Sequence, residues 1–257
     1  MREQIDFTDS VAIVTGSASG IGKGVATEFA REGADVVIAD IDDERGIDVA
    51  EEIANEHDTD TEFIYTDVSD YESCGDTVGE TVDTFGSVDV LVNVAAGGLQ
   101  NDKDLNQPFV DETPENWAPH IQVTLRGQLN ITHNVLPQMR EQDEGGAIIN
   151  FASDSYHGQD PDLTMYATAK AGVVTFTKSL AKEVGEDGIR VNCISPSTTW
   201  TPSTEEWLDE YGDRVAENYP LGRLGYPEDH ANVAVFLASD AADWVTGQVL
   251  SVNGGFI

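Results

Sequence analysis

The sequence predicts an α/β protein built on one doubly wound parallel sheet of about seven strands flanked by helices. Short runs of consecutive apolar residues recur along the chain, which is typical of strands buried on both faces. Segments with apolar residues at three- and four-residue steps separate these runs, as expected of covering helices. A glycine-rich turn joins the first strand to the first helix. Because no repeat or linker interrupts the alternation, we expect a single domain over residues 1–257.

The first unit carries this prediction most clearly. Residues 11–14 are continuously apolar, and the glycine-rich run 15–22 follows at once. A helix is expected at about 21–32, with Gly33 suited to end it. A second apolar strand follows at 36–39. Strand, turn, helix and strand in this order are typical of a βαβ unit with parallel strands.

The later elements continue the alternation. Strands are expected at residues 61–66, 88–92, 147–152, 189–194 and 249–252. Helices are expected at 42–56, 70–85, 114–140, around Tyr166, at 205–211 and at 227–238. The helix at 114–140 should turn Leu125 and Leu129 inward. Segment 99–113 and loop 195–202 should be irregular, and the segment at about 197–220 should cover a substrate.

The composition is strongly acidic. The chain has 48 Asp and Glu residues against 13 Lys and Arg, a formal net charge of −35. Such a surface repels nucleic acid and anionic membranes, so we expect neither as a partner. Molar salt would screen the self-repulsion. We therefore expect a halophilic protein; an acidic protein of an ordinary cytosol is the alternative.

Other classes of protein are not indicated. No apolar run reaches the length of a membrane span of about 18 residues. The first residues lack the apolar region of a secretory signal, so we expect a cytoplasmic protein. Cys74 and Cys193 are too few for a disulfide framework or a zinc site, so no metal is expected.

A hydroxyl, a phenol and an ammonium form the candidate catalytic group. Ser153 closes the apolar run 147–152, and Tyr166 and Lys170 lie one helical turn apart on the same face. A nearby ammonium favours the phenolate and lowers the phenol pKa, and a cationic nicotinamide would lower it further. This group suits proton transfer at a carbinol or carbonyl oxygen. Alone, the pair would more often be a partly buried tyrosine and a solvated lysine.

The glycine-rich turn indicates a dinucleotide. Its glycines permit a tight turn and let backbone amides and a helix N-terminus approach a pyrophosphate. Asp40 ends the second strand, where a carboxylate can bond both ribose hydroxyls and repel a 2′-phosphate. NAD is therefore favoured over NADP. An ordinary tight turn and a helix-capping role for Asp40 are the alternatives.

These motifs occur together in one order. The chain carries T-G-x-x-x-G-x-G at 15–22, Asp67-Val68, Asn93, Ser153, Tyr166-x-x-x-Lys170 and Ser195-Pro196. In this combination it resembles the short-chain dehydrogenase/reductase family over nearly its whole length. The resemblance implies a Rossmann fold, a nicotinamide cofactor and a homo-oligomer, a dimer or a tetramer. It also implies contacts through the Tyr166 helix, the long helix before it and the last strand.

The resemblance implies a role for each matching residue. The pyrophosphate would be cradled by Gly16, Ser19, Gly20, Ile21 and Gly22. Asp40 would hold the adenosine ribose, Asn93 would lie at the nearby ribose, and Asp67 and Val68 would border the adenine. Pro196, Thr199 and Thr201 would lie against the nicotinamide. Tyr166 would be the general acid/base, Lys170 would bond the nicotinamide ribose, and Ser153 would hold the substrate oxygen.

One departure from the family pattern concerns a fourth catalytic position. The family's helical asparagine, in N-x-x-G, aligns with Thr124 before Gly127. In the family, that asparagine is thought to hold a helix kink and a water that links the lysine to solvent. A threonine can bond the carbonyl four residues earlier and bend its helix. We therefore expect Thr124 to keep the relay in an altered form.

We therefore predict an NAD-dependent oxidoreductase that transfers a hydride between a secondary alcohol and nicotinamide. Polar residues near the site suggest a sugar, polyol or hydroxy acid, with candidate lining Asp154, Ser155, Tyr156, His157, Gln159, Trp200 and Trp207. The alternatives are a 3-oxoacyl thioester reductase and, from another class, a catalytically weak nucleotide-binding regulator. Turnover of an alcohol panel with NAD separates the enzyme from the regulator.

Overall fold

The protein contains one seven-stranded parallel sheet. The computed structural model describes residues 5–97, 107–142 and 145–257. The strands lie in the order β3-β2-β1-β4-β5-β6-β7, and each neighbouring pair is parallel. The chain direction across the sheet reverses between β1 and β4, which is where ligands bind in open sheets of this kind. The predicted doubly wound sheet is confirmed.

The elements lie close to their predicted positions. The strands are β1 (Val11–Thr15), β2 (Asp35–Asp40), β3 (Thr61–Tyr65), β4 (Val90–Asn93), β5 (Gly146–Phe151), β6 (Ile189–Pro196) and β7 (Val249–Val252). The long helices are α1 (Gly20–Arg31), α2 (Asp43–Glu56), α3 (Tyr71–Phe85), α5 (Gln128–Glu141), α6 (Thr164–Glu183), α7 (Glu205–Ala216) and α8 (Pro227–Ala238). Shorter helical pieces are α4 (Pro114–Ala118), η2 (Pro119–Gly127), η3 (Asp154–His157), η4 (Gly185–Asp187) and η5 (Asp240–Ala242).

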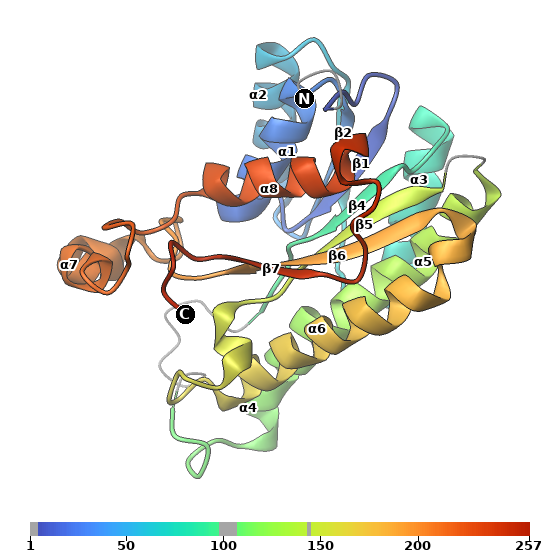
Figure 1. Cartoon of the computed structure of the whole chain (residues 1–257). Helices are drawn as coiled ribbons and strands as arrows, with labels where there is room; N and C mark the ends of the chain where they lie inside the picture. Colours follow the sequence, from blue (N-terminus) through green and yellow to red (C-terminus); the bar gives the residue numbers. More distant parts are fainter. Residues whose placement is uncertain (1–4, 98–106, 143–144) are drawn as a thin grey trace.

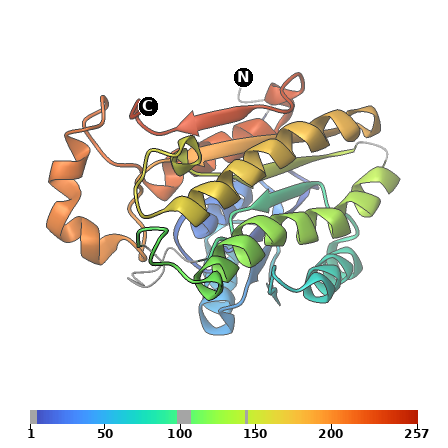
Figure 2. The same ribbon diagram turned by 90° about the horizontal axis from the view of Figure 1, so that it is seen from below.

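Helices cover both faces of the sheet. Helices α1, α2 and α8 lie on one face, and α3, α5 and α6 lie on the other (Figure 1). Figure 2 shows α5 and α6 running side by side beneath the sheet. Successive residues of a strand point to opposite faces, so Val14 joins the first apolar core and Ile13 the second. Two-sided burial explains why the strands read as unbroken apolar runs.

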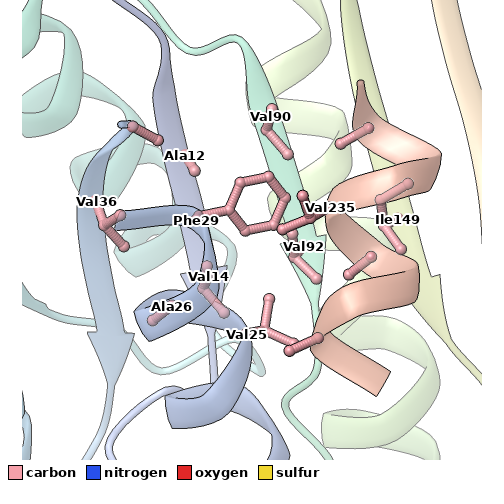
Figure 3. Close-up of a cluster of buried hydrophobic side chains, with 14 of the residues drawn as sticks. Ala12, Val14, Val25, Ala26, Phe29, Val36, Val90, Val92, Ile149 and Val235 are labelled. Carbon is pink, nitrogen blue, oxygen red and sulfur yellow. The ribbon is translucent and has the colours of Figure 1, made fainter. Parts of the chain in front are cut away.

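A single phenylalanine fills the centre of the first core. The Phe29 ring of α1 lies among valines of β1, β2 and β4 and faces Val235 of α8 (Figure 3). It is fully buried and packs edge-on against Phe7, with the ring centres 5.0 Å apart. This contact fixes α1, and with it the turn that precedes α1, against the sheet.

The long helix predicted at 114–140 is not a continuous α-helix. It consists of α4, the π-helical segment η2 and α5. A π-turn contains an extra residue, so the faces of the helix after it are rotated. Leu129, which follows the π-helical segment, is 38% exposed, so its predicted inward position is wrong.

Other differences are small. β6 continues to Pro196, and α7 continues to Ala216 instead of ending near 211. Of the segment predicted to be irregular, residues 99–106 lie outside the described part of the chain. Cys74 and Cys193 are both buried and free. Within the described ranges, none of the helices has the length and apolar character needed to cross a bilayer.

Candidate active site

The turn between β1 and α1 admits only glycine at its critical positions. Gly16 and Gly20 have φ angles of +69° and +57°, in the left-handed region. A Cβ atom added to Gly22 would lie 2.1 Å from the Gly16 carbonyl oxygen. Ser17 fastens the turn: its hydroxyl donates to the Val14 carbonyl at 2.6 Å and accepts from the Ala39 amide at 3.1 Å.

Replacing Gly22 should therefore damage the turn. We expect Gly22→Ala to lower the free energy of unfolding by about 2–4 kcal/mol, because the new methyl group meets backbone that cannot move aside. Dinucleotide affinity should fall at least tenfold. Urea unfolding and fluorescence titration with NAD measure the two effects.

Gly79→Ala is the matched control for Gly22→Ala. Gly79 lies inside α3, and a Cβ atom there would have nothing within 4 Å. Alanine should be neutral there or stabilising by up to ~1 kcal/mol, since it lowers the flexibility of the unfolded chain. Equal effects of the two changes would contradict the steric argument.

Asp40 lies where a ribose-binding carboxylate is predicted. It ends β2, and its Oδ2 accepts a hydrogen bond from the Ala18 amide of the glycine turn at 2.9 Å. Its Oδ1 accepts from the Asp42 amide at 3.1 Å. The capping residue of α2 is Asp42, whose side chain accepts from the Arg45 amide at 3.1 Å. The alternative role of Asp40 as the cap of α2 is therefore not observed.

The residues of this crevice fit a dinucleotide. Ser19 precedes α1 without a side-chain cap, so the first amides of α1 are available to an anion. The Thr201 methyl carbon would lie 3.4 Å from a Cβ atom on Gly20, so Thr201 faces the glycine turn. Ile21 is half-buried at the start of α1. The free amides at the start of α1, the glycine turn and Thr201 therefore lie together, and these groups fit a phosphate-bearing ligand.

Some predicted cofactor residues have side chains turned to the interior. Asn93 is fully buried, and its amide donates to Thr132 Oγ1 at 3.1 Å and to Asn150 Oδ1 at 2.9 Å. Val68 is 5% exposed and packs in the second core. Any contact of Asn93 or Val68 with a cofactor would therefore come mainly from the backbone.

Two further predicted cofactor residues make structural hydrogen bonds. Asp67 accepts from the amide and hydroxyl of Ser69 at 2.9 Å and 2.7 Å. Thr199 Oγ1 lies 2.8 Å from His230 Nε2, and burial lowers the pKa of His230 to about 4. Pro196 ends β6 and is buried. The cofactor roles assigned to these residues remain predictions.

The structure brings Ser153, Tyr166 and Lys170 together at the carboxyl end of β5. Tyr166 and Lys170 project from the first turns of α6 and are 6% and 2% exposed. The Lys170 amine donates to the Phe151 carbonyl at 2.7 Å and lies 5.7 Å from the centre of the Tyr166 ring. Ser153 lies two residues after the end of β5 and close enough to the Tyr166 phenol to lower its pKa.

The electrostatics differ from the prediction. Burial raises the pKa of Tyr166 to about 12, and the nearby Ser153 hydroxyl opposes this shift only in part. Burial also lowers the pKa of Lys170 to about 8. Burial thus outweighs the predicted lowering of the phenol pKa by a nearby ammonium. The cause is desolvation, which disfavours the charged form of each group.

Thr124 lies in η2 but does not bond its own helix. Its hydroxyl accepts from the Gly97 amide at 3.1 Å and donates to the Gly97 carbonyl at 3.3 Å. The predicted bond to the carbonyl four residues earlier is thus wrong, and the helix is altered instead by the π-turns of η2. Thr124 ties η2 to the segment after β4, which borders the crevice.

Sequence reasoning missed His120 as a neighbour of the phenol. His120 is 2% exposed in η2, and its ring meets the Tyr166 ring edge-on with centres 5.9 Å apart. The one available signal was its position four residues before Thr124, which the wide turns of η2 place on a nearby face.

The candidate substrate lining is only partly available. Asp154 is 3% exposed and accepts from Ser195 Oγ at 2.8 Å, so its predicted place in the lining is wrong. Burial raises the pKa of Asp154. Ser155 is also buried. Trp200 packs against a small cluster of Leu208, Tyr219 and Leu224 in the segment after β6.

The whole chain is similar to known proteins. A family model described as enoyl-(acyl carrier protein) reductase matches residues 16–257. The 3-oxoacyl-(acyl-carrier-protein) reductase FabG of Thermotoga maritima is 38% identical over 96% of this chain and 97% of its own.

Solved structures agree with this match. A short-chain dehydrogenase/reductase of Brucella melitensis, titled glucose/ribitol dehydrogenase, has a TM-score of 0.89 and 31% identity, with 98% of both chains covered. A 7α-hydroxysteroid dehydrogenase in complex with NADH and a 7-oxo bile acid has a TM-score of 0.92 and 30% identity, with 99% of this chain and 97% of that chain covered.

Proposed function

This chain belongs to the short-chain dehydrogenase/reductase family, whose enzymes act on CH–OH donors, and from this premise we propose that it is a dehydrogenase of secondary alcohols with Tyr166 as its general acid/base. The observation that carries the proposal is the meeting of Ser153, Tyr166 and Lys170 beside the β1–β4 crevice. A proton donor and acceptor at this position is expected beside a cofactor that exchanges hydride with the carbon bearing the substrate oxygen.

The residues divide the work in a simple way. A bound nicotinamide supplies the hydride acceptor or donor, and its oxidised ring carries a positive charge. The Ser153 hydroxyl holds the substrate oxygen. In the oxidative direction the Tyr166 phenolate removes the hydroxyl proton; in the reductive direction the phenol returns it. Lys170 would bond the nicotinamide ribose. Its ammonium and the positive charge of the oxidised nicotinamide would together stabilise the Tyr166 phenolate.

We propose NAD as the cofactor. Asp40 stands at the end of β2 with both oxygens fixed by backbone amides, a position that would repel a 2′-phosphate. Residues 17–19 offer no basic side chain to attract one. The cradle would use the turn residues Gly16 to Gly22, with Asp67, Val68, Asn93, Pro196, Thr199 and Thr201 completing the site.

The substrate we favour is a small hydroxylated compound such as a sugar, polyol or hydroxy acid. The second candidate is a 3-oxoacyl thioester, because a relative at 38% identity carries that name. Helix α7 lies in the proposed substrate segment at about 197–220 and exposes acidic residues, including Glu205, Glu206 and Asp209. These would repel an anionic acyl carrier, which favours the first candidate.

A substrate panel tests the proposal. Absorbance of NADH should rise when the protein is mixed with NAD and secondary alcohols in molar KCl. We expect kcat/KM with NAD at least tenfold above that with NADP, since a 2′-phosphate near Asp40 is repelled. A higher kcat/KM for a 3-oxoacyl thioester would support the second candidate. Binding of NAD without any turnover would contradict the enzyme and point to a regulator.

We also propose that the protein is halophilic. Ion pairs such as Lys23–Glu52 (2.7 Å) are present, but 13 basic residues cannot neutralise 48 acidic ones. We expect the melting temperature to rise by ~5–10 °C between 0.1 M and 3 M KCl as the repulsion is screened. Sucrose at matched osmolality is the control for a general exclusion effect. An equal melting temperature at both salt concentrations would contradict the idea.

The remaining proposals concern the assembly and its setting. We propose that residues 1–257 act as one domain, with segment 197–220 over the substrate. A homo-oligomer, either a dimer or a tetramer, in the cytoplasm is the arrangement we expect from the family. Light scattering in molar salt measures the oligomeric state.

A further inference from the structure

Three oxygen-bearing side chains form a chain that leads away from Tyr166. The Ser153 hydroxyl, which lies close enough to the Tyr166 phenol to lower its pKa, donates to Ser155 Oγ at 3.3 Å. The Ser155 hydroxyl donates in turn to Asp160 Oδ2 at 2.6 Å. The chain is therefore a continuous series of hydroxyl groups ending at a carboxylate, a group that accepts protons.

The local backbone builds this arrangement. Ser153 precedes η3, and its Oγ also accepts from the Ser155 amide at 3.3 Å. η3 is one short turn that ends at Gly158, whose φ of +73° reverses the chain. The reversal returns Asp160 to Ser155. Ser155 is 7% exposed, whereas Asp160 is partly exposed, so the chain of hydroxyls runs from a buried site to the surface.

We propose that Ser155 and Asp160, acting through Ser153, conduct the proton between Tyr166 and solvent. The inference rests on the proposed role of Tyr166. After alcohol oxidation, once the product oxygen has left Ser153, the neutral phenol releases its proton to Ser153 Oγ, the Ser153 proton moves to Ser155 Oγ, and the Ser155 proton moves to the Asp160 carboxylate. Asp160 then releases a proton to water. The phenolate is restored, no electrons are transferred, and reduction uses the same steps in reverse.

The other groups near the phenol are occupied differently. The Lys170 amine is 2% exposed and donates to the Phe151 carbonyl. The Thr124 hydroxyl is engaged by both backbone groups of Gly97. Asp160 is the member of this neighbourhood that both ends a hydroxyl chain and reaches the surface. A protonated Asp160 carboxyl at the surface exchanges its proton readily with water.

The charged groups around the path determine whether Asp160→Asn should raise or lower the rate of alcohol oxidation. Lys170 and His120 lie against the Tyr166 ring, and Asp154 and His157 act on each other near Asp160. The Asp160 charge adds to burial in raising the pKa of Tyr166. Asp160→Asn should therefore lower that pKa. If Asp160 acted only through its charge, the variant would oxidise alcohols faster near neutral pH; if it carries the proton, the variant is slower.

The experiment compares Ser155→Ala, Asp160→Asn and their double variant with wild type. The probe is the alcohol of the panel that wild type oxidises fastest, with saturating NAD and molar KCl. We expect each single variant to lower kcat about tenfold with an increased solvent deuterium isotope effect, and the double variant to be no slower than either. Added formate or acetate should restore the kcat of Asp160→Asn, because these anions accept the proton in place of the missing carboxylate. Asp162→Asn, an exposed site nearby, is the charge control and should match wild type.

A second readout does not depend on turnover. Carbon-13 NMR of the labelled Tyr166 ring should show its titration moving to lower pH in Asp160→Asn and staying unchanged in Asp162→Asn. The melting temperature of each variant, compared with that of wild type, separates loss of a proton path from misfolding. Wild-type kcat and isotope effect in Ser155→Ala and Asp160→Asn, with Tyr166→Phe inactive, would overturn the path alone. An active Tyr166→Phe would overturn the proposed function itself.

Discussion

Tyr166→Phe should lower kcat by about 10³-fold while leaving the fold intact. The change removes the one atom that exchanges a proton with the substrate, and general acid–base catalysis is worth about 10²–10⁴-fold. The ring stays in place between α6 and η2, because its packing against His120 does not need the hydroxyl. Loss of the buried hydroxyl should change the free energy of unfolding by only about 1 kcal/mol. Stopped-flow and steady-state measurements of NADH formation give the rate.

Tyr71→Phe is the matched control for this prediction. Tyr71 is exposed at the start of α3, and its hydroxyl bonds His133 Nδ1 at 2.8 Å. The same atom is lost there, so kcat should equal that of wild type. A Tyr166→Phe rate within about threefold of wild type would remove the basis for assigning the phenol a catalytic role.

Lys170→Met should reduce kcat by about 10²–10³-fold without unfolding the protein. The methionine keeps most of the volume of the buried stem but removes the amine that would bond the ribose and favour the phenolate. Unlike most losses of a buried group, this one relieves a desolvation penalty. Burial lowers the pKa of Lys170 from 10.5 to about 8, which corresponds to roughly 3 kcal/mol. Leaving the Phe151 carbonyl unpaired costs about 1–3 kcal/mol, so the variant should be as stable as wild type at pH 7.

The pH dependence of stability distinguishes relief of the buried Lys170 charge from simple tolerance of the methionine. The folded pKa of Lys170 lies below its unfolded value, so the unfolded state binds the proton more tightly. The penalty is complete below about pH 8 and disappears as pH rises to about 10.5. The stability of wild type relative to Lys170→Met should therefore rise across that window. Lys178→Met, at an exposed position of the same helix, should show no such change. Parallel stability curves for wild type and Lys170→Met would contradict the buried charge.

The fold followed from the sequence because its signals are local. Residues such as Val14 and Ile38 belong to unbroken apolar runs, and two-sided burial is the ordinary reason for such runs. The bounds of α8 and β7 were predicted without error for a similar reason, since Pro227 starts the helix and the last strand is a short apolar run. The π-helical segment η2 was missed because nothing in the composition of residues 119–127 distinguishes i→i+5 hydrogen bonds from the i→i+4 bonds of an ordinary α-helix.

The candidate site was predictable in its membership but less so in its energetics. Spacing alone placed Tyr166 and Lys170 on one face, and the structure shows this arrangement. Their pKa shifts depend on how much solvent the surrounding elements exclude, which no short motif records. Likewise, Thr124 bonds Gly97, which is 27 residues earlier. A partner so distant along the chain becomes visible only when the tertiary structure is known.

The segment between β6 and α8 contains its own small apolar cluster. Leu208, Tyr219 and Leu224 are buried there with Trp200, apart from the two cores that hold the sheet. Under the proposed role of this segment as the cover of the substrate, mutations in this cluster would reshape that cover without repacking the two cores of the sheet. Diversification of specificity and preservation of the catalytic framework become separate evolutionary problems, and a laboratory selection for a new alcohol should begin with these residues.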